Sequence, residues 1–199
     1  QQGKEDMFLA GIHRYATQQS NFSKIPGSPV AYWISNRLFE AFSDKLLSDF
    51  AQTKQGFATG DNDRFLRFWH EVSDVNTAFL CKKGADLKWF PCNKGGSYRK
   101  WYGNMEYVLD YMDNGKEFKR CPGYRGSDEK NYFMEGIVWT DISSANVSFR
   151  YLPTNCIAGA AGPMLGTIDD QFDVFCLLGF LNSKVSGLYT KLLCPTLHF

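Results

Sequence analysis

The chain has 199 residues, of which 44% are hydrophobic and 16% aromatic, with a formal net charge of +1. This composition can bury a core and excludes a disordered chain. No run of 18 apolar residues and no signal-peptide pattern occurs, so we expect a cytoplasmic protein without membrane contact.

The first 54 residues predict helices separated by a turn. A short helix is expected within residues 5–22, and Pro26 and Pro29 then impose an extended course. A clearer helix begins at Ser35 or Asn36, either of which can cap it, and runs to about Phe50. Its apolar face consists of Leu38, Phe39, Phe42, Leu46, Leu47 and Phe50.

Residues 55–72, QGFATGDNDRFLRFWHEV, change character. Glycines and Asp61-Asn62 predict a turn or strand, followed by an extended or briefly helical segment. His70 beside Glu71 could perform acid–base chemistry. Because neither a nucleophile nor a metal-ligating set accompanies this pair, a stand-alone hydrolase has weak support.

The stretch Lys88–Asn104, KWFPCNKGGSYRKWYGN, carries four cations and five aromatic residues but no acid. It is either an ordinary loop and edge strand with buried aromatic side chains, or a segment that meets phosphates and stacks its rings. Residues 82–125 hold ten cations and five acids, a net +5, whereas the flanking regions are net negative. This distribution favours a polyanionic partner at the middle third of the chain.

After the basic stretch, Asn104 is predicted to cap a helix that ends at Asn114-Gly115. Such a helix would place its N-terminus, which favours phosphate, directly after the cations. Residues 116–131 predict a polar loop. The apolar positions of this predicted helix are Met105, Val108, Leu109 and Met112.

The last third predicts strands and then two helices. Strands are expected in residues 132–142, 146–153 and 156–159, with Val147, Phe149 and Tyr151 alternating. The segment 159–166, GAAGPMLG, predicts a turn, because it lacks the strand–loop–helix context of a nucleotide-binding loop. The helices start at Asp169 or Asp170 and continue through Asn182, and then through Leu188 to a stop at Pro195. The resulting order indicates an α+β fold.

The six cysteines form no CxxC pair and have no matching histidine pair, so a structural zinc site has little support. We predict reduced, mostly buried thiols. They are Cys81, Cys92, Cys121, Cys156, Cys176 and Cys194.

Four blocks, residues 24–35, 55–72, 88–111 and 177–193, together resemble the PglX-type adenine-specific DNA methyltransferases of BREX phage-defence systems. The last block, LLGFLNSKVSGLYTKLL, also resembles a helical element of target-recognition domains in type I and type IIG restriction–modification proteins. The chain has no initiator Met, so we expect a fragment. The resemblance implies a helical connector in residues 1–54, which follows a catalytic core absent here.

By the same resemblance, residues 55–199 form a target-recognition domain, truncated at its C-terminus, with mixed strands, one inserted helix and a C-terminal helix pair. Methylation of adenine N6 needs an [ND]PP[YF] loop and a glycine-rich loop for S-adenosylmethionine. The seven prolines include no adjacent pair, and no convincing cofactor loop occurs. We therefore expect no catalytic residue, cofactor or metal in this chain, and S-adenosylmethionine bound by the parent protein.

On this interpretation the chain holds duplex DNA while a base is flipped at a remote site. Its partners would be double-stranded DNA, the parent's catalytic methyltransferase domain and other phage-defence proteins. The alternative is a protein-interaction module that docks a defence-system partner or that catalytic domain. The predicted DNA-binding residues are Asn62, Arg64, Arg67, Lys94, Gly95, Gly96, Ser97, Tyr98, Arg99, Lys100 and Trp101.

Overall fold

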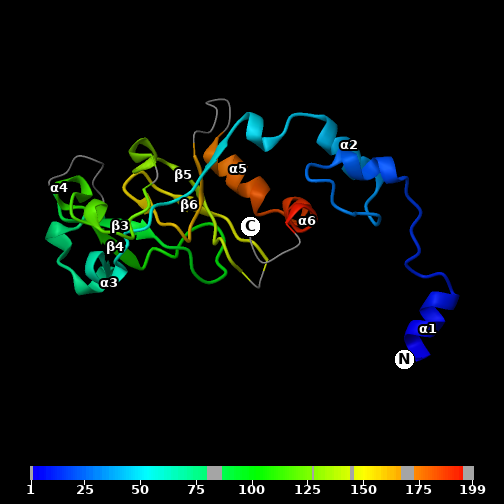
Figure 1. Cartoon of the computed structure of the whole chain (residues 1–199), viewed down its shortest axis with the longest axis horizontal. Coiled ribbons are helices and arrows are strands. Elements are labelled where there is room, and N and C mark those ends of the chain that lie inside the picture. Colours follow the sequence, from blue (N-terminus) through cyan, green and yellow to red (C-terminus); the bar gives the residue numbers. More distant parts are fainter. Residues whose placement is uncertain (1, 80–86, 127, 144–145, 167–172, 195–199) are drawn as a thin grey trace. The chain divides into compact units, whose positions relative to one another are not determined.

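The computed structural model describes residues 2–79, 87–126, 128–143, 146–166 and 173–194. The chain divides into two compact units, Gln1–Leu46 and Leu47–Phe199 (Figure 1). The prediction of an α+β fold is confirmed, because the second unit combines two sheets with a C-terminal helix pair.

The first unit has little regular structure. It contains α1 (Gln2–Leu9), a 3₁₀ turn (Gln19–Lys24), α2 (Asn36–Glu40) and a 3₁₀ turn (Ala41–Ser43). The short predicted helix ends at Leu9, because the chain enters the left-handed region at Gly11 and again at His13.

The prediction of a long helix from Ser35 to Phe50 is wrong. Helix α2 ends at Glu40, the 3₁₀ turn follows, and Asp44 is extended, with φ −97° and ψ −171°. Ser35 occupies the N-cap position but makes no side-chain capping bond, and Phe39 is the buried residue of α2. Helical spacing of apolar residues does not by itself sustain a helix of that length, because most helix stability comes from tertiary packing.

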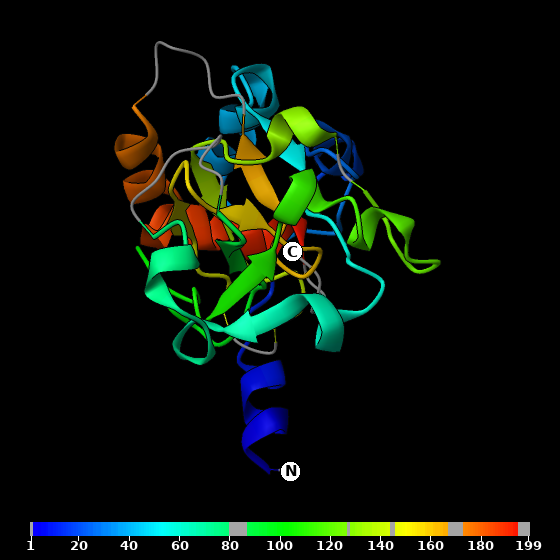
Figure 2. The ribbon, with the colours of Figure 1, turned by 90° about the vertical axis from the view of Figure 1, so that its left-hand side faces the viewer.

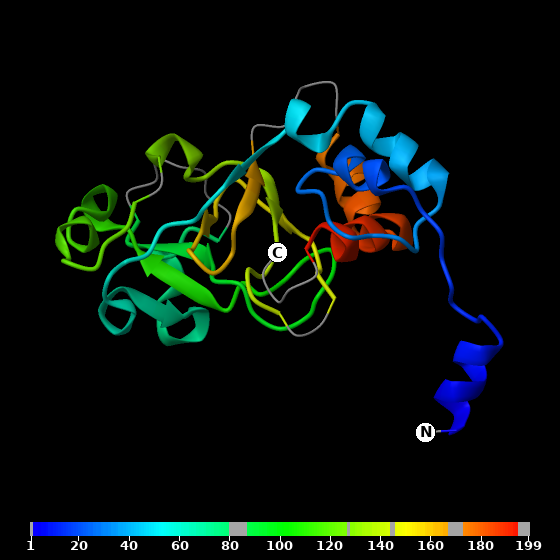
Figure 3. The same ribbon diagram turned by 45° about the vertical axis from the view of Figure 1, so that its right-hand side comes forward.

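The first sheet of the second unit has the order β1-β8-β5-β6, with every neighbouring pair antiparallel. Its core joins Ile137 and Leu165 to Leu178 and Leu181 of the helix pair. The helices lie next to β5 and β6 in Figure 1, and Figure 3 shows α5 (orange) leading into α6 (red). The strands are β1 (Gln52–Lys54), β5 (Gly136–Val138), β6 (Arg150–Leu152) and β8 (Met164–Gly166), and the helices are α5 (Val174–Leu181) and α6 (Lys184–Leu193).

The second sheet has the order β2-β4-β3-β7 and is mixed, because β7 runs parallel to β3 whereas the other pairs are antiparallel. The end of the unit that carries this sheet faces the viewer in Figure 2. Aromatic rings dominate its core, with Phe57 and Phe118 5.5 Å apart between centroids and Phe90 and Phe133 5.0 Å apart. The strands are β2 (Leu66–Phe68), β3 (Trp89–Asn93), β4 (Tyr107–Asp110) and β7 (Ile157–Ala158).

The predicted helix after Asn104 is wrong, since residues 107–110 form the internal strand β4. Val108 and Leu109 are fully buried, and β4 pairs with β2 on one side and β3 on the other. A short apolar run buried on both faces has no periodicity that separates a strand from a helix. Asn104 has φ 57° and is itself buried, so no helix N-terminus follows the basic stretch.

Several local predictions are confirmed with shorter bounds. The 55–72 region contains the brief helix α3 (Asn62–Phe65) followed by β2. The loop 116–131 holds two 3₁₀ turns, Phe118–Arg120 and Glu129–Asn131, and follows the distorted turn α4 (Met112–Gly115). The turn predicted for 159–166 is confirmed only in residues 159–163, because Met164–Gly166 form β8 of the first sheet.

The C-terminal helix pair is also confirmed. Asp173 caps α5 by accepting hydrogen bonds from the N–H groups of Phe175 and Cys176. The predicted start at Asp169 or Asp170 and the stop at Pro195 lie outside the described residues. No helix among those described is long and apolar enough to cross a membrane.

The cysteines that the structure describes are free thiols, as predicted, although not all of them are buried. Cys92 and Cys156 are buried, Cys121 and Cys194 are half-buried, and Cys176 is exposed on α5. Cys81 lies outside the described residues.

Candidate nucleic-acid interface

Residues 94–106 connect β3 to β4, and two buried asparagines hold this loop from beneath. Asn93 Nδ2 donates to the carbonyl of Asn104 at 3.1 Å, and Asn93 Oδ1 accepts from the N–H of Gly95 at 3.2 Å. Asn104 Nδ2 donates to the carbonyl of Ser97 at 2.9 Å. Buried amides that satisfy loop backbone groups in this way fix the shape of the loop.

A buried arginine provides the second support. Arg150 of β6 is 0% exposed, and its Nη1 donates to the carbonyl of Arg99 at 3.3 Å and to Ser148 Oγ at 3.2 Å. Its Nη2 donates to Thr140 Oγ1 at 3.1 Å, and that hydroxyl donates to the carbonyl of Gly96 at 3.0 Å. Burial, with a smaller contribution from the charge of Arg99, lowers the pKa of the guanidinium to about 10. The interior beneath the loop therefore holds a cation whose hydrogen-bond partners are neutral oxygens.

The loop also joins the open edge of the first sheet. The N–H of Trp101 donates to the carbonyl of Phe149 at 3.0 Å, and the N–H of Tyr151 donates to the carbonyl of Trp101 at 2.8 Å. Lys100 Nζ donates to the carbonyl of Asn182, the C-cap residue of α5, at 2.6 Å. Residues 96–101 are thus anchored to β6 and to the helix pair at once.

The large side chains that residues 98–102 expose to solvent are aromatic or cationic. Tyr98 and Trp101 are each 53% exposed, and Tyr102 is 59% exposed. The Arg99 side chain is about half exposed and forms an ion pair with Glu106 at 3.6 Å. We refer to these four residues, Tyr98, Arg99, Trp101 and Tyr102, as the loop surface.

Of the residues that were predicted to contact phosphate, some are exposed and others are bonded or buried inside the protein. Gly95 is buried with φ +80°, and a Cβ there would lie 2.4 Å from the carbonyl oxygen of Ala161, so this glycine shapes the loop. Gly96 and Ser97 are exposed, whereas the ammonium of Lys100 is already bonded to α5. The backbone N–H of Gly95 and the charge of Lys100 are therefore used inside the protein.

The other predicted group gathers at a cleft of about 380 Å³ beside β2 and β4. Asn62, Arg67 and Lys94 line this β2–β4 cleft together with Tyr107, and Lys94 Nζ lies 5.1 Å from the Tyr107 ring centroid. Two acids, Asp63 and Glu71, also line it.

The remaining candidate of this group, Arg64, is not among the residues that line the cleft. Its Nη2 pairs with Glu117 Oε2 at 2.6 Å, and its guanidinium carbon lies 4.9 Å from the Phe65 ring centroid. The structure therefore brings Asn62 and Arg67 together with Lys94 of the basic stretch and holds Arg64 in an ion pair of its own.

His70 and Glu71 have structural roles. Glu71 Oε2 accepts from the N–H of Phe68 at 2.8 Å, which closes a 3₁₀ turn, and the His70 ring stacks on Phe68 with centroids 5.6 Å apart. The described residues contain no cluster of three His, Cys, Asp or Glu side chains that could hold a metal ion. This pair offers no assembled acid–base site.

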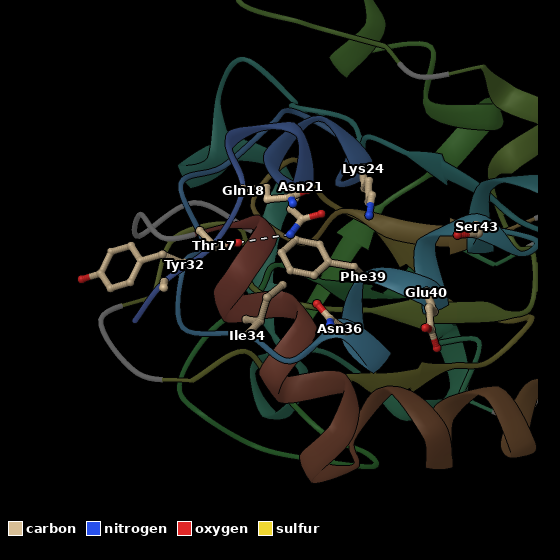
Figure 4. A pocket seen from close by; sticks show the side chains of 11 residues that line it. Thr17, Gln18, Asn21, Lys24, Tyr32, Ile34, Asn36, Phe39, Glu40 and Ser43 are labelled. Atoms are coloured by element: carbon tan, nitrogen blue, oxygen red, sulfur yellow. Dashed lines mark hydrogen bonds between the residues drawn. The ribbon is translucent and has the colours of Figure 1, made fainter. Parts of the chain in front are cut away.

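The first unit contains a cavity of about 740 Å³, which none of the predicted binding residues lines. Figure 4 shows Phe39 and Ile34 among mostly polar side chains, with Asn21 bonded to Thr17 at 3.2 Å. Lys24 and Glu40 carry the charges of its lining, one of each sign. A mostly polar lining with one charge of each sign does not indicate which kind of ligand this cavity would bind.

Sequence reasoning missed the residues that hold the loop in place. Asn93, Arg150 and Asn182 are all buried polar side chains that bond to backbone groups. Arg150 could have been recognised from the sequence. It lies in the middle of a strand-like run of apolar residues, and a cation buried there needs hydrogen-bond partners inside the protein.

Two curated relatives match the chain. It is 37% identical to the adenine-specific methyltransferase PglX of Lacticaseibacillus casei (strain Zhang) over 220 residues, which covers 100% of the chain and 18% of that protein. It is 39% identical over 186 residues to the adenine-specific methyltransferase BrxX of Escherichia coli O9:H4 (strain HS), which covers 92% of the chain and 15% of that protein. No family model matches.

These matches place the chain among sequences related to adenine-specific methyltransferases. The chain corresponds to a fragment of the PglX-type BREX methyltransferases, which confirms the resemblance of the four sequence blocks. The chain spans less than a fifth of the length of either relative.

Proposed function

We propose that this segment binds duplex DNA as part of the target-recognition region of an adenine-N6 DNA methyltransferase. The observation that supports the proposal best is the loop surface, in which three exposed aromatic rings and Arg99 project from a backbone held by buried Asn93 and Arg150. A rigid support of this kind lets cations and ring faces meet nucleic acid without the cost of ordering the loop.

Within this proposal, Arg99 contacts a backbone phosphate and Tyr98 packs against a sugar. The β2–β4 cleft supplies a second surface, where Asn62 and Arg67 are suited to reading adenine and guanine edges in the major groove. Lys94 lines the same cleft. The net charge of +5 in residues 82–125 adds a sequence-independent attraction for DNA.

The chemistry belongs to the parent protein in this proposal. Both relatives are named adenine-specific methyltransferases, and the chain contains no adjacent prolines from which an [ND]PP[YF] loop could be built. The parent's catalytic domain would bind S-adenosylmethionine and methylate the flipped adenine in the cytoplasm, in phage defence. Residues 1–54 would connect that domain to the recognition region formed by residues 55–199.

A second candidate function is a protein-interaction module. The first unit exposes large apolar side chains, among them Phe8 at 68% and Leu9 at 72%. Exposed apolar groups on a short segment are typical of a surface that another domain or protein covers. The occupant would be the parent's catalytic domain or another phage-defence protein.

Duplex binding as a function of salt separates the two functions. We expect the logarithm of the binding constant to fall linearly with the logarithm of salt concentration, and Arg99→Ala to reduce the slope by about 0.9, as expected for one lost phosphate contact. The control is Lys130→Ala, which removes an exposed cation that pairs with Asp128 and lies outside both candidate surfaces. Absence of duplex binding at the lowest salt would overturn the DNA proposal in favour of the interaction module.

A further inference from the structure

Trp101 combines an unusual backbone with an exposed side chain. Its φ is 75°, in the left-handed region that bulky residues rarely adopt, and 53% of the residue is exposed. Burial therefore does not explain why a tryptophan stands there, and a glycine would adopt this conformation more easily. A residue held in such a conformation is a candidate for function.

The backbone of Trp101 is held on both sides. Its N–H and carbonyl bond to Phe149 and Tyr151 across the open edge of β6, at 3.0 Å and 2.8 Å. Arg150, which lies between those two residues, holds the carbonyl of Arg99 from beneath. The conformation of Trp101 is thus imposed by the sheet edge.

Trp101 is surrounded by aromatic side chains, and the nearby cation Arg99 pairs with Glu106. Tyr98 and Tyr102 are exposed on the same loop, and Tyr151, which bonds to the Trp101 backbone, stacks on exposed Phe175 with centroids 5.0 Å apart. The sequence contains no acid from residue 87 to residue 105, while Arg99 lies two positions before Trp101. A flat ring next to a cation suits a ligand that carries both a π face and a phosphate.

We propose that Trp101 stacks on an unpaired nucleobase of a DNA strand. This inference rests on the proposed function, because it takes DNA as the partner. In an intact duplex the base faces are covered by their neighbours, so an indole ring reaches one only where a base pair has opened. Arg99 would hold the adjacent phosphate, and Trp101 would favour the opened form of the duplex over the paired form.

The test compares two fluorescein-labelled duplexes with the whole chain, by fluorescence anisotropy. The duplexes have the same sequence, except that one carries a single bulged adenine. We expect the wild-type chain to bind the bulged duplex roughly 5- to 160-fold more tightly, the range that one stacked base contributes. Trp101→Ala should reduce this preference to less than about twofold.

Two further variants separate stacking from folding. Trp101→Gly suits a φ of 75°, so it should melt no lower than Trp101→Ala and still lose the preference. Trp101→Phe keeps a ring and should retain part of the preference. The matched control is Trp33→Ala, because Trp33 is 50% exposed in the other unit and should leave both affinities unchanged.

The outcomes also separate this inference from the proposed function. Binding to paired duplex without any preference for the bulge would overturn the role of Trp101 and leave the proposed function intact. A preference that survives in Trp101→Gly would overturn it as well. If neither duplex binds at low salt, the proposed function fails and the inference fails with it.

Discussion

The buried guanidinium of Arg150 donates to the backbone carbonyl of Arg99 at 3.3 Å, so one arginine inside the protein fixes the position of another at its surface. The partners of Arg150 also include Ser148 and Thr140, all through neutral oxygens. A buried charge without a bonded carboxylate is costly. The hydrogen bonds of the Arg150 guanidinium offset that cost, and they also fix the conformation of the loop.

Replacing Arg150 by Met should lower the free energy of unfolding by about 1–3 kcal/mol, because the Arg99 carbonyl and the Thr140 hydroxyl lose a buried partner. Urea denaturation measures this change. Arg150→Lys keeps the charge without the planar fork and should restore only part of the stability. A Met variant that matches the wild type in both stability and duplex binding would show that Arg150 does not hold the loop.

Replacing Gly95 by Ala should destabilise the second unit by at least about 1 kcal/mol, because φ is +80° and the added Cβ would lie 2.4 Å from the Ala161 carbonyl oxygen. Thermal melting measures the loss. The matched control is Gly179→Ala in α5, where nothing lies within 4 Å of the added Cβ. That variant should gain roughly 0.5–1 kcal/mol from helix propensity. Equal melting temperatures for the two variants would contradict the role assigned to Gly95.

The failed helix prediction shows what the local pattern of apolar residues cannot decide. Met105, Val108, Leu109 and Met112 fit helical spacing, yet Val108 and Leu109 are covered on both faces of an internal strand. The turn at Asn114 indicated a helix end, and the chain does turn there, with φ 58°. The neighbours that favour a strand, β2 and β3, come from residues up to 43 positions away (Leu66 with Leu109), and the local pattern does not report them.

Residues 146–153 also show that a local pattern does not determine which side chains are buried. Alternation was predicted, and it occurs, but the more deeply buried face carries Ser148, Arg150 and Leu152, whereas Phe149 and Tyr151 are only half-buried. Polarity alone does not show which face is buried, because the polar side chains on the inner face have internal partners. The basic composition of residues 88–104 could be read directly. However, Arg150 and Asn182, which bond to the Arg99 carbonyl and to the Lys100 ammonium, come from distant parts of the chain.

Raising the pH above about 9 should destabilise the protein through Cys92. Burial raises the pKa of this thiol from its ordinary value of 9.0 to about 12. Between these values the unfolded chain loses the proton and the folded chain keeps it, so the unfolded state binds fewer protons and the free energy of unfolding falls as pH rises. The stabilisation is complete below pH 9 and is lost towards pH 12.

At one pH unit above the ordinary value, the expected loss from Cys92 is about 1 kcal/mol. Urea denaturation in a reducing buffer at a series of pH values measures it, with Cys92→Ala as the comparison. The Ala variant is less stable at neutral pH but should decline less steeply, since one of the titrating groups has been removed. Parallel curves for the two proteins would exclude Cys92 as a source of the decline.

Lys100 and Arg99 are neighbours in the sequence, but we expect them to act differently. Lys100 Nζ bonds to the carbonyl of Asn182 at the C-terminal end of α5, where a cation also meets the negative end of the helix dipole. Lys100→Met keeps most of the side-chain length and should cost roughly 1 kcal/mol of stability. Because this ammonium is already bonded, the salt dependence of duplex binding should change much less than in Arg99→Ala. Anisotropy titrations of both variants over the same salt series decide the matter, since equal flattening of the slope would mean that Lys100 leaves Asn182 to contact a phosphate.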